Sequence, residues 1–266
     1  MSTVESIIIA IVEGLTEFLP ISSTGHMIIA ERLLRLPKED TFIQLFTVAI
    51  QLGAILSVVV LYWRKFFDFS KWQFYLKLVV AVLPALAIGF VLSDKIDELL
   101  DSPLTVAITM LLGGIVLLFI DRAFKNPVVE HEKDITYTKA LVIGLWQCVA
   151  MVPGVSRSAA SIIGGMQQSL TRKLAAEFSF FLAVPTMAAA TGYKLLKTYK
   201  EHPEVLSNTQ NLGMLAIGNV VAFVVAMLAI KFFIGYLQKY GFKLFGWYRI
   251  IGGAILLAMI SSGYIS

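Results

Sequence analysis

Residues 12–26 read VEGLTEFLPISSTGH, and they interrupt an apolar region that extends from residue 3 to residue 35. The stretch holds two carboxylates, a proline, three consecutive hydroxyls, a glycine and a histidine. Each unpaired polar group that is buried in hydrocarbon costs several kcal/mol, so an inert membrane anchor is not built in this way. We therefore interpret this stretch as one half of an active site.

The composition indicates a membrane protein. Of the 266 residues, 58% are hydrophobic and 15% are charged, and the mean hydropathy is +0.79. Soluble domains have about 45–50% apolar and about 25% charged residues. We expect a polytopic membrane protein whose net charge of +4 records its topology, and we expect no nucleic-acid partner.

Six segments are long and apolar enough to cross a bilayer, which takes about 20 residues. They are residues 42–63, 75–92, 104–120, 177–195, 212–234 and 247–265. Two further apolar regions, 3–35 and 136–170, are broken by PISSTG after residue 19 and by PGVSRS after residue 152. Each half of a broken region is too short to span, so we predict two re-entrant helix–loop–helix hairpins.

The order of a hairpin and three spans occurs twice and predicts an internal repeat. The first repeat is 1–135 and the second is 136–266, within one integral membrane domain. Matching pairs, with a three-residue insertion in the second repeat, are Gly14 with Gly144, Glu17 with Gln147, Pro20 with Pro153 and Ser23 with Ser156. Because each repeat has an odd number of spans, the second should insert upside down. The predicted fold class is an all-α polytopic membrane protein with inverted topology.

Lysine and arginine are concentrated on one side of the predicted spans. That set is Arg64, Lys65, Lys71, Lys77, Arg122, Lys125, Lys133, Lys139, Arg172, Lys173, Lys231, Lys239, Lys243 and Arg249. The side richer in positive charge should be cytoplasmic. Both termini and the mouth of the first hairpin then face outward, while the second hairpin enters from the cytoplasm.

Glu13 and Glu17 lie four residues apart, so on a helix their carboxylates share one face. An exposed acidic surface is the alternative interpretation, but the flanking residues are apolar. The pair can act as a general base or can bind a hard divalent cation such as Mg²⁺ or Ca²⁺.

Ser22, Ser23 and Thr24 follow a proline and precede an apolar segment, where free N–H groups gather at a helix N-terminus. Capping needs only one hydroxyl, so three hydroxyls together with Gly25 indicate an anion cradle. His26 is the only histidine in an apolar segment. It is either a general acid/base or nucleophile, or a structural histidine.

Arg157 is the strongest single signal in the second half of the chain. An arginine at the tip of a membrane hairpin needs an anion, and its planar fork suits a phosphate held by two hydrogen bonds. The alternative is that it only pairs with Glu13 or Glu17.

Two motifs, EGLTEFLPISSTGH (13–26) and PGVSRSAA (153–160), resemble the signature motifs of the bacterial undecaprenyl pyrophosphate phosphatase family, which is associated with bacitracin resistance. The resemblance covers essentially the whole chain. It implies dephosphorylation of the C55 lipid carrier pyrophosphate outside the bacterial cytoplasmic membrane, with a divalent cation. It also implies that the site is carried by Glu13, Glu17, Ser23, His26 and Arg157.

We expect the pyrophosphate to lie between the hairpin tips. The groups expected to hold it are Arg157, Ser156, Ser158 and the hydroxyl and N–H groups of Ser22, Thr24 and Gly25. Ser23 attacks the terminal phosphorus, Glu17 or His26 accepts its proton, and a metal on Glu13 and Glu17 offsets charge. Attack by His26 or by a metal-activated water stays open.

Other functions and partners also stay open. A transporter or flippase for an anionic polyprenyl lipid would use the same inverted repeat, but it has no evident use for the acid pair, serines and histidine. An acid phosphatase of the unrelated superfamily is disfavoured because no later histidine–aspartate partner is found. The expected partners are the polyprenyl pyrophosphate and the bilayer, and the sequence does not decide whether the chain forms a homodimer.

Overall fold

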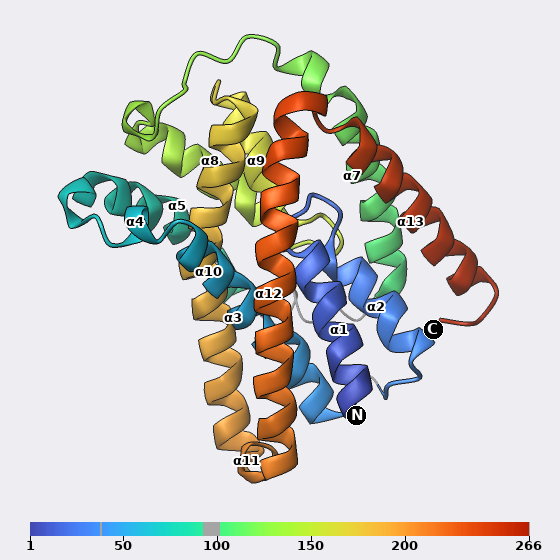
Figure 1. Cartoon of the computed structure of the whole chain (residues 1–266). Coiled ribbons are helices and arrows are strands. Elements are labelled where there is room, and N and C mark those ends of the chain that lie inside the picture. The colour runs from blue at the N-terminus through green and yellow to red at the C-terminus, as the bar shows by residue number, and fades with distance from the viewer. Residues whose placement is uncertain (38, 93–101, 266) are drawn as a thin grey trace.

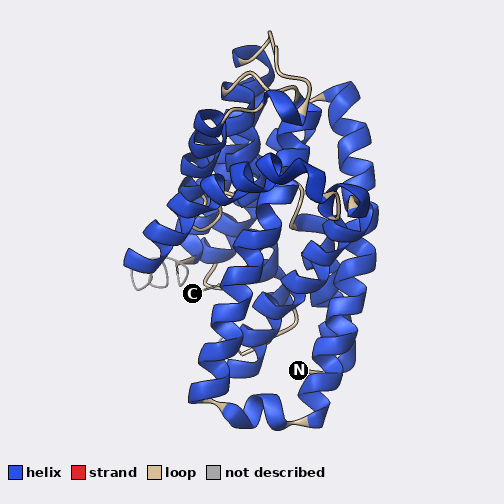
Figure 2. Ribbon diagram, turned by 90° about the vertical axis from the view of Figure 1, so that its left-hand side faces the viewer, coloured by secondary structure: helices blue, strands red, loops and turns tan. Residues whose placement is uncertain are grey.

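The computed structural model describes residues 1–37, 39–92 and 102–265, and these residues are almost entirely helical. The first half contains α1 Thr3–Thr16, α2 Ser23–Leu33, α3 Thr41–Leu61, α4 Trp63–Phe66, η1 Phe69–Lys71, α5 Trp72–Val91 and α7 Pro103–Ala123. The second half contains η2 Glu132–Asp134, α8 Tyr137–Val149, α9 Arg157–Gln167, α10 Arg172–Glu201, α11 Pro203–Ser207, α12 Thr209–Tyr240 and α13 Lys243–Ser261. Figure 2 shows helix over most of the described chain, with loops at both ends of the bundle.

The six predicted spans are confirmed as helices. Within the described ranges, six helices are long and apolar enough to cross a membrane: α3, α5, α7, α10, α12 and α13. Two of them are longer than their apolar cores predict, since α10 has 30 residues and α12 has 32. Their N-caps explain the earlier starts, because Thr171 and Asn208 accept hydrogen bonds from the first turns outside the apolar segments.

Both predicted breaks are present in the structure. The first separates α1, of 14 residues, from α2, of 11, and the second separates α8, of 13 residues, from α9, of 11. At about 1.5 Å per residue none of these helices reaches the roughly 30 Å of a bilayer core. The first broken segment is 17–22, which we call loop A, and the second is 150–156, which we call loop B.

Two of the short helices, α1 and α8, pack against spanning helices of the opposite half (Figure 1). A Cβ on Gly14 of α1 would lie 2.8 Å from the carbonyl oxygen of Ala222 in α12, and one on Gly144 of α8 would lie 2.1 Å from that of Ala81 in α5. Only glycine permits backbones to approach so closely, as is usual where membrane helices pack. In addition, α3 packs on α10 and α12, and α7 packs on α13.

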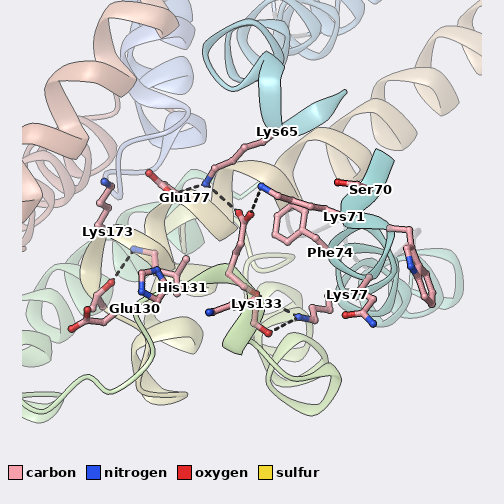
Figure 3. Close-up of a pocket in the computed structure, with 15 residues that line it drawn as sticks. Lys65, Ser70, Lys71, Phe74, Lys77, Glu130, His131, Lys133, Lys173 and Glu177 are labelled. Carbon is pink, nitrogen blue, oxygen red and sulfur yellow. Dashed lines mark hydrogen bonds and ion pairs between the residues drawn. The ribbon is translucent and has the colours of Figure 1, made fainter. Parts of the chain in front are cut away.

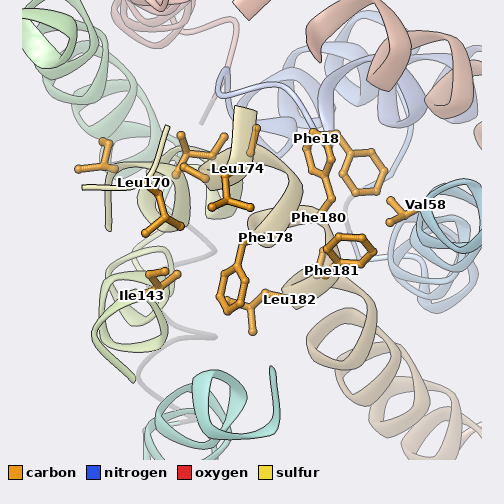
Figure 4. Packing of buried hydrophobic residues seen from close by; sticks show 14 of the residues in the cluster. Phe18, Val58, Ile143, Leu170, Leu174, Phe178, Phe180, Phe181 and Leu182 are labelled. Carbon is orange, nitrogen blue, oxygen red and sulfur yellow. The ribbon is translucent and has the colours of Figure 1, made fainter. Parts of the chain in front are cut away.

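The largest core cluster is rich in phenylalanine and surrounds the N-terminal half of α10 (Figure 4). Phe180 meets Phe18 of loop A edge to face, with ring centroids 5.3 Å apart. Its neighbour Phe181 meets Tyr62 and Phe74, both with centroids within 5.2 Å. Edge-to-face pairs add about 0.5–1.5 kcal/mol to the burial of the rings. This cluster fixes loop A against α10.

Candidate functional site

Loop A contacts the helix that follows loop B through a direct hydrogen bond. The hydroxyl of Ser158, in the first turn of α9, donates to the carbonyl oxygen of Leu19 in loop A at 2.8 Å. The same hydroxyl lies 3.0 Å from that of Ser156. The predicted hairpin tips are thus side by side, although the chain separates Ser158 and Leu19 by 139 residues.

Each loop ends in a serine that caps the next helix. Ser22 and Ser156 have φ of 70° and 74°, an unusual backbone for a residue other than glycine, and each hydroxyl accepts from the N–H three residues later. Such a conformation costs about 1–3 kcal/mol and is common at functional sites. The caps also correct the sequence alignment, because Ser22 rather than Ser23 is the counterpart of Ser156. Ser23 and Arg157 are therefore both the first residues of their helices.

Glu17 is the centre of the site. Its Oε2 accepts a hydrogen bond from the hydroxyl of Ser23 at 2.7 Å, and its Oε1 accepts from Nη2 of Arg157 at 2.9 Å. The side chains of Glu17 and Arg157 are 7% and 14% exposed. Three predicted site residues from the two halves of the chain, Glu17, Ser23 and Arg157, are thus joined around the buried carboxylate of Glu17.

Arg157 has contacts besides Glu17. Its Nη1 donates to the carbonyl oxygen of Ser179 at 3.1 Å, and its guanidinium lies 5.6 Å from the ring centroid of Phe18. Its Nε is buried and has no hydrogen-bond partner among the described residues. In this structure Arg157 is held by a carboxylate, and it retains one donor for a ligand.

Glu13 lies one turn before Glu17 and is 1% exposed. Its Oε1 is buried without a hydrogen-bond partner in the described part of the chain. A buried carboxylate oxygen without a partner is costly, so it is a candidate ligand for a cation or a proton. Of the two predicted cation ligands, Glu13 thus has a free oxygen, whereas both oxygens of Glu17 accept hydrogen bonds from Ser23 and Arg157.

His26 lies in α2, and its ring contacts α13 rather than Glu17. Its Nδ1 is 2.7 Å from the carbonyl oxygen of Ser22, and its Nε2 is 2.9 Å from the hydroxyl of Tyr248. The two rings are stacked, with an interplanar angle of 7°. Tyr248 gave no sequence signal, because an aromatic near the end of a span is usually an interface anchor.

The remaining predicted site residues have different surroundings. Thr24 is half-buried near the start of α2. Gly25 is predicted to allow close approach of a ligand, but the atom that approaches it is Sδ of Met110 in α7, which would lie 2.2 Å from an added Cβ. The glycine at this position is thus explained by helix packing.

Arg249 is the important residue that the sequence misplaced. We assigned it to the cytoplasmic loop charges, but it is 0% exposed inside α13. Its guanidinium donates at 2.8–3.3 Å to the carbonyl oxygens of Thr109, Met110, Pro20, Gly154 and Val155. It therefore holds loop A, loop B and α7 together. The reasoning applied to Arg157 would have found it, because Arg249 also lies within an apolar segment.

A separate, charged cleft of about 860 Å³ lies between α4, α5, η2 and α10 (Figure 3). Lys65 contacts Glu132 at 3.1 Å and Glu177 at 3.4 Å, and Lys71 contacts Glu132 at 3.1 Å. Burial works to raise the pKa of Glu132, but the two ammonium groups outweigh it, so this pKa lies below its ordinary value. This cleft and the Glu17–Arg157 pair contact the same phenylalanine cluster, since Lys65 lies over Phe181.

Comparisons with known proteins agree with the two motifs. The family model described as bacitracin resistance protein BacA matches residues 6–255. An undecaprenyl-diphosphatase of Flavobacterium johnsoniae is 58% identical over 258 residues, which cover 97% of this chain and 96% of the relative. The undecaprenyl-diphosphatase of Porphyromonas gingivalis strain W83 is 50% identical over 280 residues, which cover 99% of this chain and 98% of the relative. That of Bdellovibrio bacteriovorus is 50% identical over 266 residues, again covering 99% and 98%. The chain therefore belongs to the bacitracin resistance protein BacA family.

Proposed function

We propose that the chain is an integral membrane phosphatase that hydrolyses undecaprenyl diphosphate to undecaprenyl phosphate and inorganic phosphate. This reaction returns the lipid carrier to peptidoglycan synthesis. The observation that carries the proposal is the arrangement around Glu17, where a serine hydroxyl and an arginine converge on one buried carboxylate. The family membership and the six apolar helices agree with it.

Ser23 is the nucleophile in the mechanism that this geometry favours. Its hydroxyl already donates to Glu17 at 2.7 Å, so Glu17 is placed to take the proton as the oxygen attacks the terminal phosphorus. The bond from that phosphorus to the bridging oxygen breaks, and undecaprenyl phosphate leaves. Arg157, through its charge and its free Nε, stabilises the charge that develops on the phosphoryl oxygens.

Water completes the reaction. A water oxygen attacks the phosphorus of phosphorylated Ser23, the bond between phosphorus and the serine oxygen breaks, and inorganic phosphate leaves. His26 accepts the water proton, and Glu17 returns its proton to Ser23. Glu17 is thus the proton acceptor in the first step, and His26 is the proton acceptor in the second.

Glu13 and Glu17 would hold a divalent cation. The orphaned Oε1 of Glu13 supports this assignment, and in the described ranges no third Asp, Glu, His or Cys joins the pair. Magnesium or calcium commonly takes its other ligands from phosphates and water. When bound, the cation supplies charge neutralisation for the diphosphate.

The broken segments are best explained as re-entrant hairpins of two inverted repeats. Support comes from the matched pairs Gly14 with Gly144 and Ser22 with Ser156, which have the same roles in helix packing and capping. Helices too short to span can end at membrane depth only where other parts of the protein cover them. The positive-inside rule then directs the site to the outer face of the cytoplasmic membrane.

Phosphate release from undecaprenyl diphosphate by purified protein in detergent tests the function. We expect turnover in the wild type, loss of activity on addition of EDTA with recovery on addition of Mg²⁺ or Ca²⁺, and at least about 10²-fold lower kcat in Glu17→Gln and Ser23→Ala. Ser207→Ala, in the distant α11, is the control. Full activity of Ser23→Ala would exclude the serine mechanism, and full turnover in excess EDTA would exclude the cation.

A further inference from the structure

The contact between His26 and Tyr248 joins two helices that lie far apart in the sequence. The hydroxyl of Tyr248 is 2.9 Å from Nε2 of His26, across 222 residues of chain, and the ring centroids are 5.4 Å apart. Arg249, the next residue of α13, binds the carbonyl oxygens of loops A and B. Tyr248 is therefore held at a fixed position relative to both loops.

The hydrogen bonds define the tautomer of His26. Its Nδ1 is 2.7 Å from the carbonyl oxygen of Ser22, and a carbonyl oxygen can only accept. The proton of the neutral ring is therefore on Nδ1, and Nε2 has the free lone pair. The hydroxyl of Tyr248 then donates to Nε2.

We propose that Tyr248 is a positioning residue for the phosphatase reaction, and that its hydroxyl orients Nε2 of His26 as the proton acceptor until water replaces it. The inference rests on the role of His26 in the proposed function. Ser23 does not compete for this nitrogen, because its hydroxyl donates to Glu17. The site thus contains two separate acceptors, each with its own hydroxyl donor: Ser23 for Glu17 and Tyr248 for His26.

A double-mutant cycle tests whether Tyr248 acts through His26. Tyr248→Phe keeps the stacked ring and removes only the hydroxyl, so we expect kcat to fall about 10-fold with KM unchanged. In a His26→Gln background, Tyr248→Phe should change kcat less than about 2-fold, because residues that act as a unit are not additive. Tyr264→Phe is the matched control, since its hydroxyl makes no hydrogen bond within the described chain. A full additional loss in the His26→Gln background would overturn the proposal.

Nitrogen NMR of His26 gives a readout that does not depend on activity. The chain has three histidines, so His131→Gln with His202→Gln leaves His26 as the only one. In detergent we expect one neutral form with the proton on Nδ1. In Tyr248→Phe the Nε2 resonance should shift, because the Nε2 lone pair loses its hydrogen-bond donor. Arg249 of α13, a helix that packs on α2, is a charged neighbour of His26, and every variant keeps it.

The two experiments separate failure of this inference from failure of the proposed function. An unchanged His26 spectrum in Tyr248→Phe would overturn the positioning role even if the enzyme is a phosphatase. Absence of phosphate release from undecaprenyl diphosphate by the wild-type protein would instead remove the proposed function. Thermal unfolding shows whether a variant folds, and Tyr248 is 47% exposed, so a phenylalanine is expected to fold normally.

Discussion

Arg157 links the two halves of the site, and its geometry matters more than its charge. Nη2 contacts Glu17 while Nη1 contacts Ser179, so one planar group makes two bonds in fixed directions. Lysine keeps the charge but cannot reproduce this fork.

We therefore expect Arg157→Lys to lower kcat/KM by about 10²-fold or more, with folding intact. Steady-state kinetics and thermal unfolding of Arg157→Lys and Arg157→Ala, side by side, are the measurements. Arg172→Lys is the control, because Arg172 pairs with Asp121 away from the site. Near-normal turnover of Arg157→Lys would mean that Arg157 only neutralises Glu17.

Arg249 should matter for stability as well as for activity. Arg249→Met removes a buried cation and leaves carbonyl oxygens of loops A and B without a donor, and each unsatisfied buried group costs about 1–3 kcal/mol. We expect a loss of at least about 3 kcal/mol in the free energy of unfolding, seen as a lower Tm in detergent. Arg122→Met, at an exposed position, should leave Tm unchanged. Equal Tm values for the two variants would contradict the role of Arg249 as a clamp.

At the scale of elements, the sequence predicted the helices better than it predicted their contacts. The lengths of the apolar segments predicted the six spans, and Pro20 and Pro153 predicted the two breaks, because both signals are local in the sequence. The partners of Glu17 were also predictable, since charged groups buried in an apolar region must find one another. The positions of Tyr248 and Arg249 were not, because their roles depend on how α13 packs against loops that are distant in sequence.

In the charged cleft, Glu132 of η2 pairs with Lys65 of α4 and Lys71 of η1, so the stability that these ion pairs contribute should depend on pH. The pKa of Glu132 is lowered, and its ion pairs with Lys65 and Lys71 thus contribute stability above the unfolded value of about 4.3, which is lost as pH falls through the lower folded value. Glu132→Gln should reduce the free energy of unfolding by about 1 kcal/mol at pH 7. The difference from wild type should shrink as the pH falls below about 4.3 and should vanish below the lowered pKa of Glu132 in the folded protein. Thermal unfolding of both proteins across pH measures it, with Glu201→Gln, at the exposed other end of α10, as the control.

The two ends of the molecule are formed by different segments of the chain. Both termini and α11 lie toward one end, and the segment between α7 and α8 crosses the other (Figure 1). The lysines of the charged cleft lie at the second end, which the positive-inside rule assigns to the cytoplasm.

Cysteine labelling in intact cells tests this orientation. In a Cys148→Ser background, which removes the only native cysteine, Ser207→Cys should react with an impermeant reagent and Lys71→Cys should not. Both positions are exposed, so the side of the membrane on which each lies decides whether it is labelled. Labelling of Lys71→Cys alone would reverse the orientation.

The bond between Glu17 and Arg157 spans 140 positions, and it has a consequence for the origin of the chain. Fragments 1–135 and 136–266 each carry one partner, so either fragment alone should be inactive, and their co-expression should restore phosphate release. An ancestor of half this length would have needed two copies, inserted in opposite orientations, to complete one site. Gene duplication and fusion would have fixed both orientations in a single polypeptide. On the proposed repeat, later divergence of the two copies would account for Gln147 in the second half where the first half has Glu17.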